Sequence, residues 1–350
     1  MRKKGRSVTT KRLDELWKRG KDFLGTQYAI LGGAMTWVSE RNLVSAISNA
    51  GGFGVIASGA MSPDLLRTEI KATQELTSKP FGVNLITMHP QLMDLIDICI
   101  QENITHVVLA GGLPPTQAIT KLKENGIKVL CFAPALVLAR KLIKLGVDAL
   151  IVEGMEAGGH IGPVSTSVLV QEILPHIKDI PVFVAGGIGR GEAIVSYLEM
   201  GAAGCQLGTH FVCTTECIAH PDFKKAFLRA QARDAIIAPQ LDGRFPVIPV
   251  RALANQATKD FIDYQRKLIN QVDQGILELK EAQLKIEHFW AGTLKRAVIE
   301  GDIEHGSMMA GQSVGMVTHE QPTQDVINEL ILQATSALES RTMPKAAALC

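Results

Sequence analysis

The chain has 350 residues, of which 46% are hydrophobic and 20% charged, and its mean hydropathy is +0.15. This composition supplies enough apolar surface to offset the chain entropy of folding, which excludes a fibrous or disordered protein. The formal net charge of +1 excludes a global field that would attract nucleic acid or anionic lipid.

The first 21 residues contain nine Lys or Arg but no continuous apolar core of the kind that a signal peptide needs. We therefore expect residues 1–24 to form a basic, solvated N-terminal arm. No apolar run reaches the roughly 18 residues of a membrane span. A cytoplasmic protein with reduced cysteines and with no membrane or nucleic-acid partner is expected.

Short apolar runs alternate with longer segments of helical periodicity over residues 25–218. Runs of consecutive apolar residues indicate strands that are buried on both faces, as parallel strands under helices are. Eight such units predict a TIM (β/α)8 barrel, whose active site lies at the carboxyl ends of the strands. A doubly wound open sheet is the alternative, and the regularity of eight units favours closure. The expected strands are Tyr28–Leu31, Gly54–Ala57, Phe81–Ile86, His106–Leu109, Lys128–Ala133, Ala149–Glu153, Pro181–Ala185 and Gly204–Leu207.

The alternation stops after Cys217, and residues 219–304 contain helical segments on both sides of a break at Pro246–Pro249. We expect a small C-terminal helical domain here. A second pattern, His210, Cys213, Cys217 and His220, superficially offers four zinc ligands. Structural zinc usually draws on two separated ligand pairs, so we predict a strand end followed by a buried helix, and no metal.

One histidine stands in a glycine-rich loop after the sixth expected strand, in the sequence from Glu153 to Pro163. Glycines at 154, 158, 159 and 162 let the backbone approach a ligand, and a barrel would place His160 at its mouth. His160 is therefore the predicted catalytic residue.

The loops after the seventh and eighth strands are also rich in glycine. They carry Gly186 and Gly187, and then Gly208 and Thr209. In a barrel these two loops commonly hold a phosphate group through backbone N–H donors. At the first strand Gly33, Ala34 and Met35 offer close approach, and at the third strand Asn84 can both donate and accept hydrogen bonds. Together these residues predict a flat, phosphorylated cofactor.

Motifs of other enzyme classes are missing. The sequence has no G-x-G-x-x-G after its first strand, no Walker A sequence, no G-x-S-x-G and no H-E-x-x-H. A Rossmann dehydrogenase, a P-loop enzyme, a serine hydrolase and a zincin are therefore unsupported. A flavin-free isomerase or lyase acting on sugar phosphates would use the same phosphate loops, but it needs a Lys or Asp at a strand end, and none stands out.

These motifs resemble the flavin-dependent TIM barrels that comprise enoyl-[acyl-carrier-protein] reductase II and nitronate monooxygenase, formerly 2-nitropropane dioxygenase. The resemblance implies FMN, with its phosphate near Gly186, Gly187, Gly208 and Thr209. It also implies a homodimer and a segment over 305–350 that returns to the barrel mouth with Gly306 to Gln312. The matching stretches that include further cofactor-binding residues are Gly33-Ala34-Met35, Pro80 to Asn84, Glu153 to Gly162 with Gly158, and Gln206-Leu207-Gly208-Thr209.

Two activities share this scaffold, and His160 would be the acid or base in both. A reductase takes electrons from NADH or NADPH and reduces an enoyl thioester, whereas a monooxygenase oxidises an alkyl nitronate with O2. Monooxygenases resemble G-G-H-R-G, with an arginine that favours an anion, whereas this chain has Ile161 after the histidine. The reductase is therefore favoured, with a small-molecule or acyl-carrier-protein-linked substrate, although the changed first-strand motif, Leu31 to Ala34, leaves room for another substrate.

Overall fold

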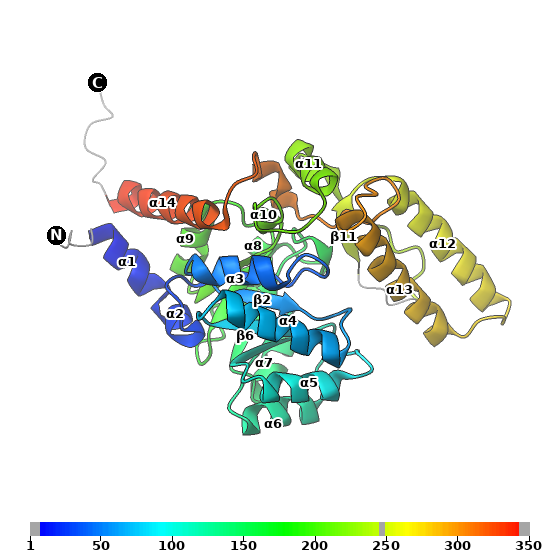
Figure 1. Cartoon of the computed structure of the whole chain (residues 1–350), viewed down its shortest axis with the longest axis horizontal. Helices are drawn as coiled ribbons and strands as arrows, with labels where there is room; N and C mark the ends of the chain where they lie inside the picture. Colours follow the sequence, from blue (N-terminus) through cyan, green and yellow to red (C-terminus); the bar gives the residue numbers. More distant parts are fainter. Residues whose placement is uncertain (1–7, 245–248, 343–350) are drawn as a thin grey trace.

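The computed structural model describes residues 8–244 and 249–342, and its main body is an eight-stranded parallel barrel (Figure 1). The strand order is β1-β9-β8-β6-β5-β4-β3-β2. Between the two end strands, Phe53 N donates to Ile30 O at 2.8 Å and Gly32 N donates to Phe53 O at 2.9 Å, so the barrel is nearly closed. The TIM barrel is confirmed and the open sheet is not. The strands are β1 (Ile30–Gly32), β2 (Gly54–Ala57), β3 (Phe81–Ile86), β4 (His106–Ala110), β5 (Lys128–Phe132), β6 (Ala149–Glu153), β8 (Val182–Ala185) and β9 (Gly204–Leu207).

Helices surround these strands because each has one apolar face that packs on the sheet. Ser62 illustrates how the sequence starts them: its hydroxyl accepts a hydrogen bond from Leu65 N, and Pro63 occupies the first helical position. The surrounding helices are α3 (Arg41–Asn49), α4 (Pro63–Leu76), α5 (Leu92–Gln101), α6 (Thr116–Glu124), α7 (Leu136–Lys144), α8 (Thr166–Ile173), α9 (Gly191–Glu199) and α10 (Thr209–Val212).

The N-terminal stretch differs from the solvated arm that its charge suggested. Residues 8–24 form α1 (Val8–Leu16) and α2 (Lys18–Leu24), and Trp17 between them is only 1% exposed. Phe23 of α2 contacts the barrel from its amino-terminal end, where its ring lies 6.1 Å from that of Phe183 in β8. Part of the basic segment is therefore held in place by Trp17 and Phe23, and it packs as a plug at the amino-terminal end of the barrel.

The region 219–304 is helical as expected, but it also contains two strands. These are β10 (Ala235–Ile237) and β11 (Val250–Leu253), which form a small antiparallel sheet with the two-residue strand β7 (Gly159–His160). Pro246 of the expected break lies outside the described residues. The helices are α11 (Pro221–Arg229), α12 (Gln256–Asp273) and α13 (Leu279–Val298), with short turns η1 (Ala232–Asp234) and, later, η2 (Gln312–Met316).

The long helices α12 and α13 lie side by side, at the opposite end of the molecule from α1 and α14 (Figure 1). They have a small core of their own, in which the Phe261 and Trp290 rings lie 4.3 Å apart. The last helix, α14 (Thr323–Thr342), packs against α9, α3 and α1. Among the described residues, no helix is long and apolar enough to cross a membrane.

Candidate active site

All the site residues predicted from the sequence lie at the carboxyl ends of barrel strands, or in the loops that follow them. Parallel strands in a barrel end on the same face, so these residues share one mouth. The positions are Gly33, Ala34 and Met35 after β1; Asn84 in β3; Glu153 at the end of β6, followed by Gly158 and His160; Gly186 and Gly187 after β8; Gln206 and Leu207 in β9; and Gly208 and Thr209 after it.

The loops after β1 and β9 meet closely. Gly33 N donates to Leu207 O at 2.7 Å, and a Cβ added to Gly33 would lie 3.4 Å from Gly208 Cα. A Cβ added to Gly208 would lie 3.4 Å from Met35 Sδ. Ser39, which the sequence did not single out, fixes this loop by donating to Gly33 O and accepting from Met35 N. The loops after β1 and β9 therefore approach each other to van der Waals distance at this corner of the mouth.

The neighbouring loop after β8 has two glycines with left-handed backbone, Gly186 with φ 95° and Gly187 with φ 71°. A Cβ at Gly186 would lie 2.9 Å from Gly154 O, so this turn tolerates no larger residue. Within the described part of the chain, the N–H groups of Gly187 and Gly208 have no acceptor. Two unpaired donors on adjacent glycine loops are the donor set that a phosphate group requires, and they fit the FMN phosphate.

His160 is exposed at the mouth and is held there by β11. Val250 pairs with His160 and Arg251 pairs with Gly159 in antiparallel register, and Ile161 N donates to Pro249 O at 2.9 Å. This pairing joins the small domain to the His160 loop. It sets the direction of the His160 loop. The paired segments are far apart in the sequence, so no local sequence pattern predicts the pairing.

Arg251 is a second anchor of this loop, and it was not among the residues predicted for the site. Its side chain is buried, its Nε donates to Met155 O at 2.8 Å, and its Nη1 donates to Ala235 O. Burial lowers the pKa of Arg251, and the nearby Glu156 carboxylate raises it. An arginine within an apolar strand was the one signal that could have identified it.

Glu156 ties the same loop to helix α8. Its carboxylate accepts hydrogen bonds from both Thr166 N and Thr166 Oγ1 at 2.8 Å. Thr166 is the first residue of α8, so the carboxylate also lies at the positive end of the helix dipole. The Thr166 hydroxyl lies 3.1 Å from Gly186 O as well, which links the loops after β6 and β8.

The segment Gly306 to Gln312 returns to the mouth, as the family resemblance implied. Gly311 N donates to Thr209 Oγ1 and Gln312 N donates to Glu156 O, each at 2.9 Å. A Cβ at Gly158 would lie 2.6 Å from the backbone of Ala310 and Gly311. The late segment therefore packs directly on the predicted phosphate loop and on the His160 loop.

Three polar side chains face the inside of the barrel near its mouth. Asn84 is buried and its Nδ2 donates to Val108 O at 3.1 Å. Glu153 pairs with Ala185 and Ala185 pairs with Gln206, so Glu153 and Gln206 face the same way at the same level. Burial raises the pKa of Glu153 to about 8. A carboxyl group that is neutral near pH 7 can donate a hydrogen bond.

The zinc-like pattern does not converge. His210 is buried in α10, Cys213 Sγ lies 3.7 Å from Lys224 O, and the His220 ring accepts from Asp222 N at the start of α11. In residues 8–244 and 249–342, no group of three or more His, Cys, Asp or Glu side chains is arranged to hold a metal.

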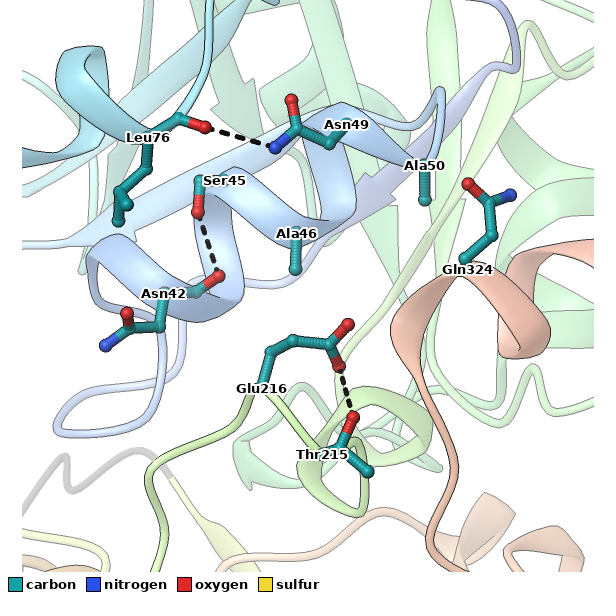
Figure 2. A pocket seen from close by; sticks show the side chains of 9 residues that line it. All are labelled: Asn42, Ser45, Ala46, Asn49, Ala50, Leu76, Thr215, Glu216 and Gln324. Atoms are coloured by element: carbon teal, nitrogen blue, oxygen red, sulfur yellow. Dashed lines mark hydrogen bonds between the residues drawn. The ribbon is translucent and has the colours of Figure 1, made fainter.

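A surface cavity of about 590 Å³ lies away from the His160 mouth, along the outer side of α3 (Figure 2). Figure 2 shows α3 on one side of it, with Thr215, Glu216 and Gln324 on the other. Glu216 is already used, since its carboxylate accepts from Thr323 N and Oγ1 at the start of α14. The cavity contains none of the predicted site residues.

Comparison with known proteins identifies the family. The family model described as nitronate monooxygenase matches residues 18–333. The chain belongs to the nitronate monooxygenase family. It is therefore a flavin-dependent oxidoreductase, and this excludes the flavin-free isomerase or lyase.

Relatives within the nitronate monooxygenase family have different activities. The chain is 37% identical to FabK, an enoyl-acyl-carrier-protein reductase II, of Thermotoga maritima, with a TM-score of 0.82 over 92% of this chain and 97% of that one. Its identity to nitroalkane oxidase from Streptomyces ansochromogenes is 26%, with a TM-score of 0.77 over 92% and 99%. It is 30% identical, over 91% of this chain and 96% of the relative, to a (3aS,4S,5R,7aS)-5-hydroxy-7a-methyl-1-oxo-octahydro-1H-indene-4-carboxyl-CoA dehydrogenase from Rhodococcus jostii.

Proposed function

We propose that the protein is an FMN-dependent reductase of an enoyl thioester, with NADH or NADPH as the electron donor. The observation that carries this proposal is a set of three exposed apolar side chains that follow β3, β4 and β5, at the same end of the barrel as the His160 loop. Met88 after β3 is 65% exposed, Leu113 after β4 is 47% exposed, and Val137 at the start of α7 is 76% exposed. These strands are neighbours in the order β5-β4-β3, so the three side chains follow one side of the mouth. An acyl group would cover them.

The residue after the histidine supports the same substrate class. Ile161 is 2% exposed and apolar, so this position supplies no cation for a nitronate. Arg251 is a buried cation on the strand that pairs with the His160 loop, but its side chain already donates hydrogen bonds to two backbone carbonyl oxygens. The similarity to FabK and to a dehydrogenase named for a carboxyl-CoA compound also favours a thioester over a nitronate.

In this proposal the overall reaction is enoyl thioester plus NAD(P)H plus H⁺ to acyl thioester plus NAD(P)⁺. FMN, when bound, would supply the hydride that the β-carbon takes up. His160 donates the proton to the α-carbon, a role that its exposed position at the mouth permits. The N–H groups of Gly187 and Gly208 would hold the FMN phosphate, and Met35, Asn84 and the His160 loop would flank its ring.

The alternative is oxidation of alkyl nitronates with O2, which the family name and the similarity to nitroalkane oxidase favour. Anaerobic stopped-flow absorbance at the flavin band separates the two. The purified protein is mixed in turn with NADH, NADPH and propyl-2-nitronate. Bleaching by a nicotinamide that a crotonyl thioester reverses supports the reductase. Bleaching by the nitronate alone, reversed by air, establishes the monooxygenase instead.

A further inference from the structure

Trp37 lies in the loop after β1 and has a backbone conformation that few residues with a side chain adopt. Its φ is 66°, in the left-handed region, and Val38 N donates to Met35 O at 3.0 Å across the turn that contains it. Glycine is the usual residue at such a turn position. In the part of the chain that the structure describes, Asn103 is the only other non-glycine residue with positive φ, and asparagine tolerates it. A bulky aromatic residue in this conformation is strained, and such strain is typical of functional positions.

The indole ring of Trp37 supports the ammonium group of Lys295, a residue of α13. Lys295 Nζ lies 5.4 Å from the centre of the ring, within the range of a cation–π contact. The indole N–H is enclosed and has no acceptor among the described residues, so no hydrogen bond explains why the ring is held here. The contact with Lys295 is the polar interaction that the Trp37 side chain does make.

The turn of α13 that carries Lys295 lies at the mouth, because it also holds the start of the segment that returns there. Ser307 N donates to Thr293 O at 2.8 Å, and a Cβ added to Gly306 would lie 2.5 Å from Ala297 N. Lys295 lies between Thr293 and Ala297 in the sequence and is exposed. The ammonium group is therefore fixed at the edge of the mouth by the loop after β1 and by the returning segment.

Lys295 has no carboxylate partner among the described residues. Two carboxylates close to it in the sequence or on the loop after β1 are engaged elsewhere. Asp302 is bonded to Arg296, and Glu40 caps the start of α3 by accepting from two backbone N–H groups. An ammonium group that the fold orients but leaves unpaired is available to an anionic group of a ligand.

We propose that Lys295, held over the Trp37 ring, binds a phosphate group of a reactant that comes to the flavin. This inference rests on the function proposed above, in which both reactants carry phosphate at a distance from the reacting atoms. NAD(P)H carries it in its diphosphate, and an enoyl thioester carries it in the phosphopantetheine part of coenzyme A or of an acyl carrier protein. Lys295 is then a residue that determines which reactants bind well, and it takes no part in hydride or proton transfer.

The strand order places Lys295 across the mouth from the apolar side chains that follow β3, β4 and β5. In the ring of eight strands β1 stands opposite β5, and Trp37 belongs to the loop after β1. A thioester whose acyl group covers the exposed Met88, Leu113 and Val137 would extend its phosphate-bearing end toward Lys295. A nicotinamide dinucleotide would offer its diphosphate to the same ammonium group.

The experiment measures equilibrium affinity by isothermal titration calorimetry of the FMN-loaded, full-length protein. Each phosphate-bearing ligand has a phosphate-free counterpart: NAD⁺ or NADP⁺ is compared with nicotinamide riboside, and butyryl-CoA with butyryl-N-acetylcysteamine. The proteins are the wild type, Lys295→Gln, Lys295→Arg and Lys280→Gln. Lys280 is an exposed lysine near the opposite end of α13, roughly 20 Å from Lys295 along the helix, and its variant is the control for loss of charge.

Lys295→Gln should weaken binding of a phosphate-bearing ligand about tenfold and leave its phosphate-free counterpart unchanged. A loss with the dinucleotide assigns the phosphate to NAD(P)H, and a loss with butyryl-CoA assigns it to the thioester. Lys295→Arg keeps the charge and stacks on an aromatic ring equally well, so it should bind like the wild type, as should Lys280→Gln. High salt should narrow the difference between the wild type and Lys295→Gln.

The results that overturn the inference differ in what else they remove. Equal affinities of the wild type and Lys295→Gln for both phosphate-bearing ligands would overturn it and leave the proposed function intact. An equal loss with the phosphate-free ligands would do the same, since Lys295 would then act only on the shape of the mouth, and so would a Lys295→Arg variant as weak as Lys295→Gln. A wild type that binds neither the dinucleotides nor butyryl-CoA would overturn the proposed reductase, and this inference with it.

Discussion

The ammonium group of Lys128 lies 5.0 Å from the centre of the Phe23 ring and donates to the Phe23 carbonyl oxygen at 2.6 Å. His106 Nε2 donates to the same oxygen at 2.9 Å, and its Nδ1 accepts from the Thr105 hydroxyl. One carbonyl thus takes two donors from β4 and β5. This joins α2 to the end of the barrel opposite His160.

We predict that acid weakens this plug through His106. Burial, together with the charge of Lys128, lowers the pKa of His106 to about 4 from its usual 6.5. The neutral ring therefore stabilises the fold above pH 6.5, and this contribution is lost as pH falls from 6.5 toward 4. Urea unfolding at pH 7 and pH 4.5 should show a larger loss of unfolding free energy for the wild type than for His106→Gln. Equal losses would contradict the assignment.

Replacing the predicted catalytic residue should affect turnover without affecting the cofactor. His160→Ala should retain FMN and lose roughly 10²-fold to 10⁴-fold in kcat, the range typical of a general acid. His176→Ala, a change at an exposed histidine after α8, is the matched control and should keep full activity. Stopped-flow kinetics with the better nicotinamide checks both, and an unchanged rate in His160→Ala would remove this residue from the mechanism.

Replacement by alanine should destabilise the protein at one glycine of the His160 loop and be tolerated at another. Gly158→Ala places a Cβ 2.6 Å from the Ala310 and Gly311 backbone, so we expect a loss of about 1–3 kcal/mol in stability and weaker FMN binding. Gly162→Ala meets only Pro134 Cβ, at 4.0 Å, and should be tolerated. Thermal unfolding and FMN titration of the two variants measure the contrast. Equal behaviour would mean that the returning segment does not press on Gly158.

The phosphate loop can be tested with a pair of isosteric variants at Gly208. A Cβ there has space, since its nearest atom is Met35 Sδ at 3.4 Å. Gly208→Asp adds a negative charge beside the phosphate, whereas Gly208→Asn adds the same volume without charge. We expect the aspartate variant to bind FMN at least tenfold more weakly than the asparagine variant, with the gap narrowing in high salt. Equal affinities would place the phosphate elsewhere.

Much of the barrel could be predicted because its strands are apolar runs bounded by glycine or proline. Gly54–Ala57, Phe81–Ile86, Ala149–Glu153 and Gly204–Leu207 are observed at their expected bounds. The strands β7, β10 and β11 were missed. Each is two to four residues long and exists only through pairing with another segment: His160 of β7 pairs with Val250 of β11, about 90 positions later, and Ala235 of β10 pairs with Leu253 of β11. No local pattern encodes such a pairing.

In the candidate site, too, local sequence patterns predicted some features, and contacts between distant segments determined the rest. Strand ends gather at one mouth, so the position of the glycine loops and of His160 at that mouth could be predicted, while their roles stay predictions. The residues that hold them were not foreseen, because Arg251, Thr166 and Ser39 act through contacts whose partners lie elsewhere in the fold. The N-terminal helices were misjudged for a related reason: a basic composition says nothing about the apolar face that Leu13, Trp17 and Leu24 bury.

The hydrogen bond from Gly311 to Thr209 also has a consequence for biosynthesis. Thr209 leaves the ribosome about a hundred residues before its partner does. All eight barrel strands can therefore pair on a nascent chain while the cofactor mouth still lacks one wall. Flavin capture should be a late event in synthesis, and a ribosome-arrested chain that stops before residue 306 should carry a folded barrel that remains colourless.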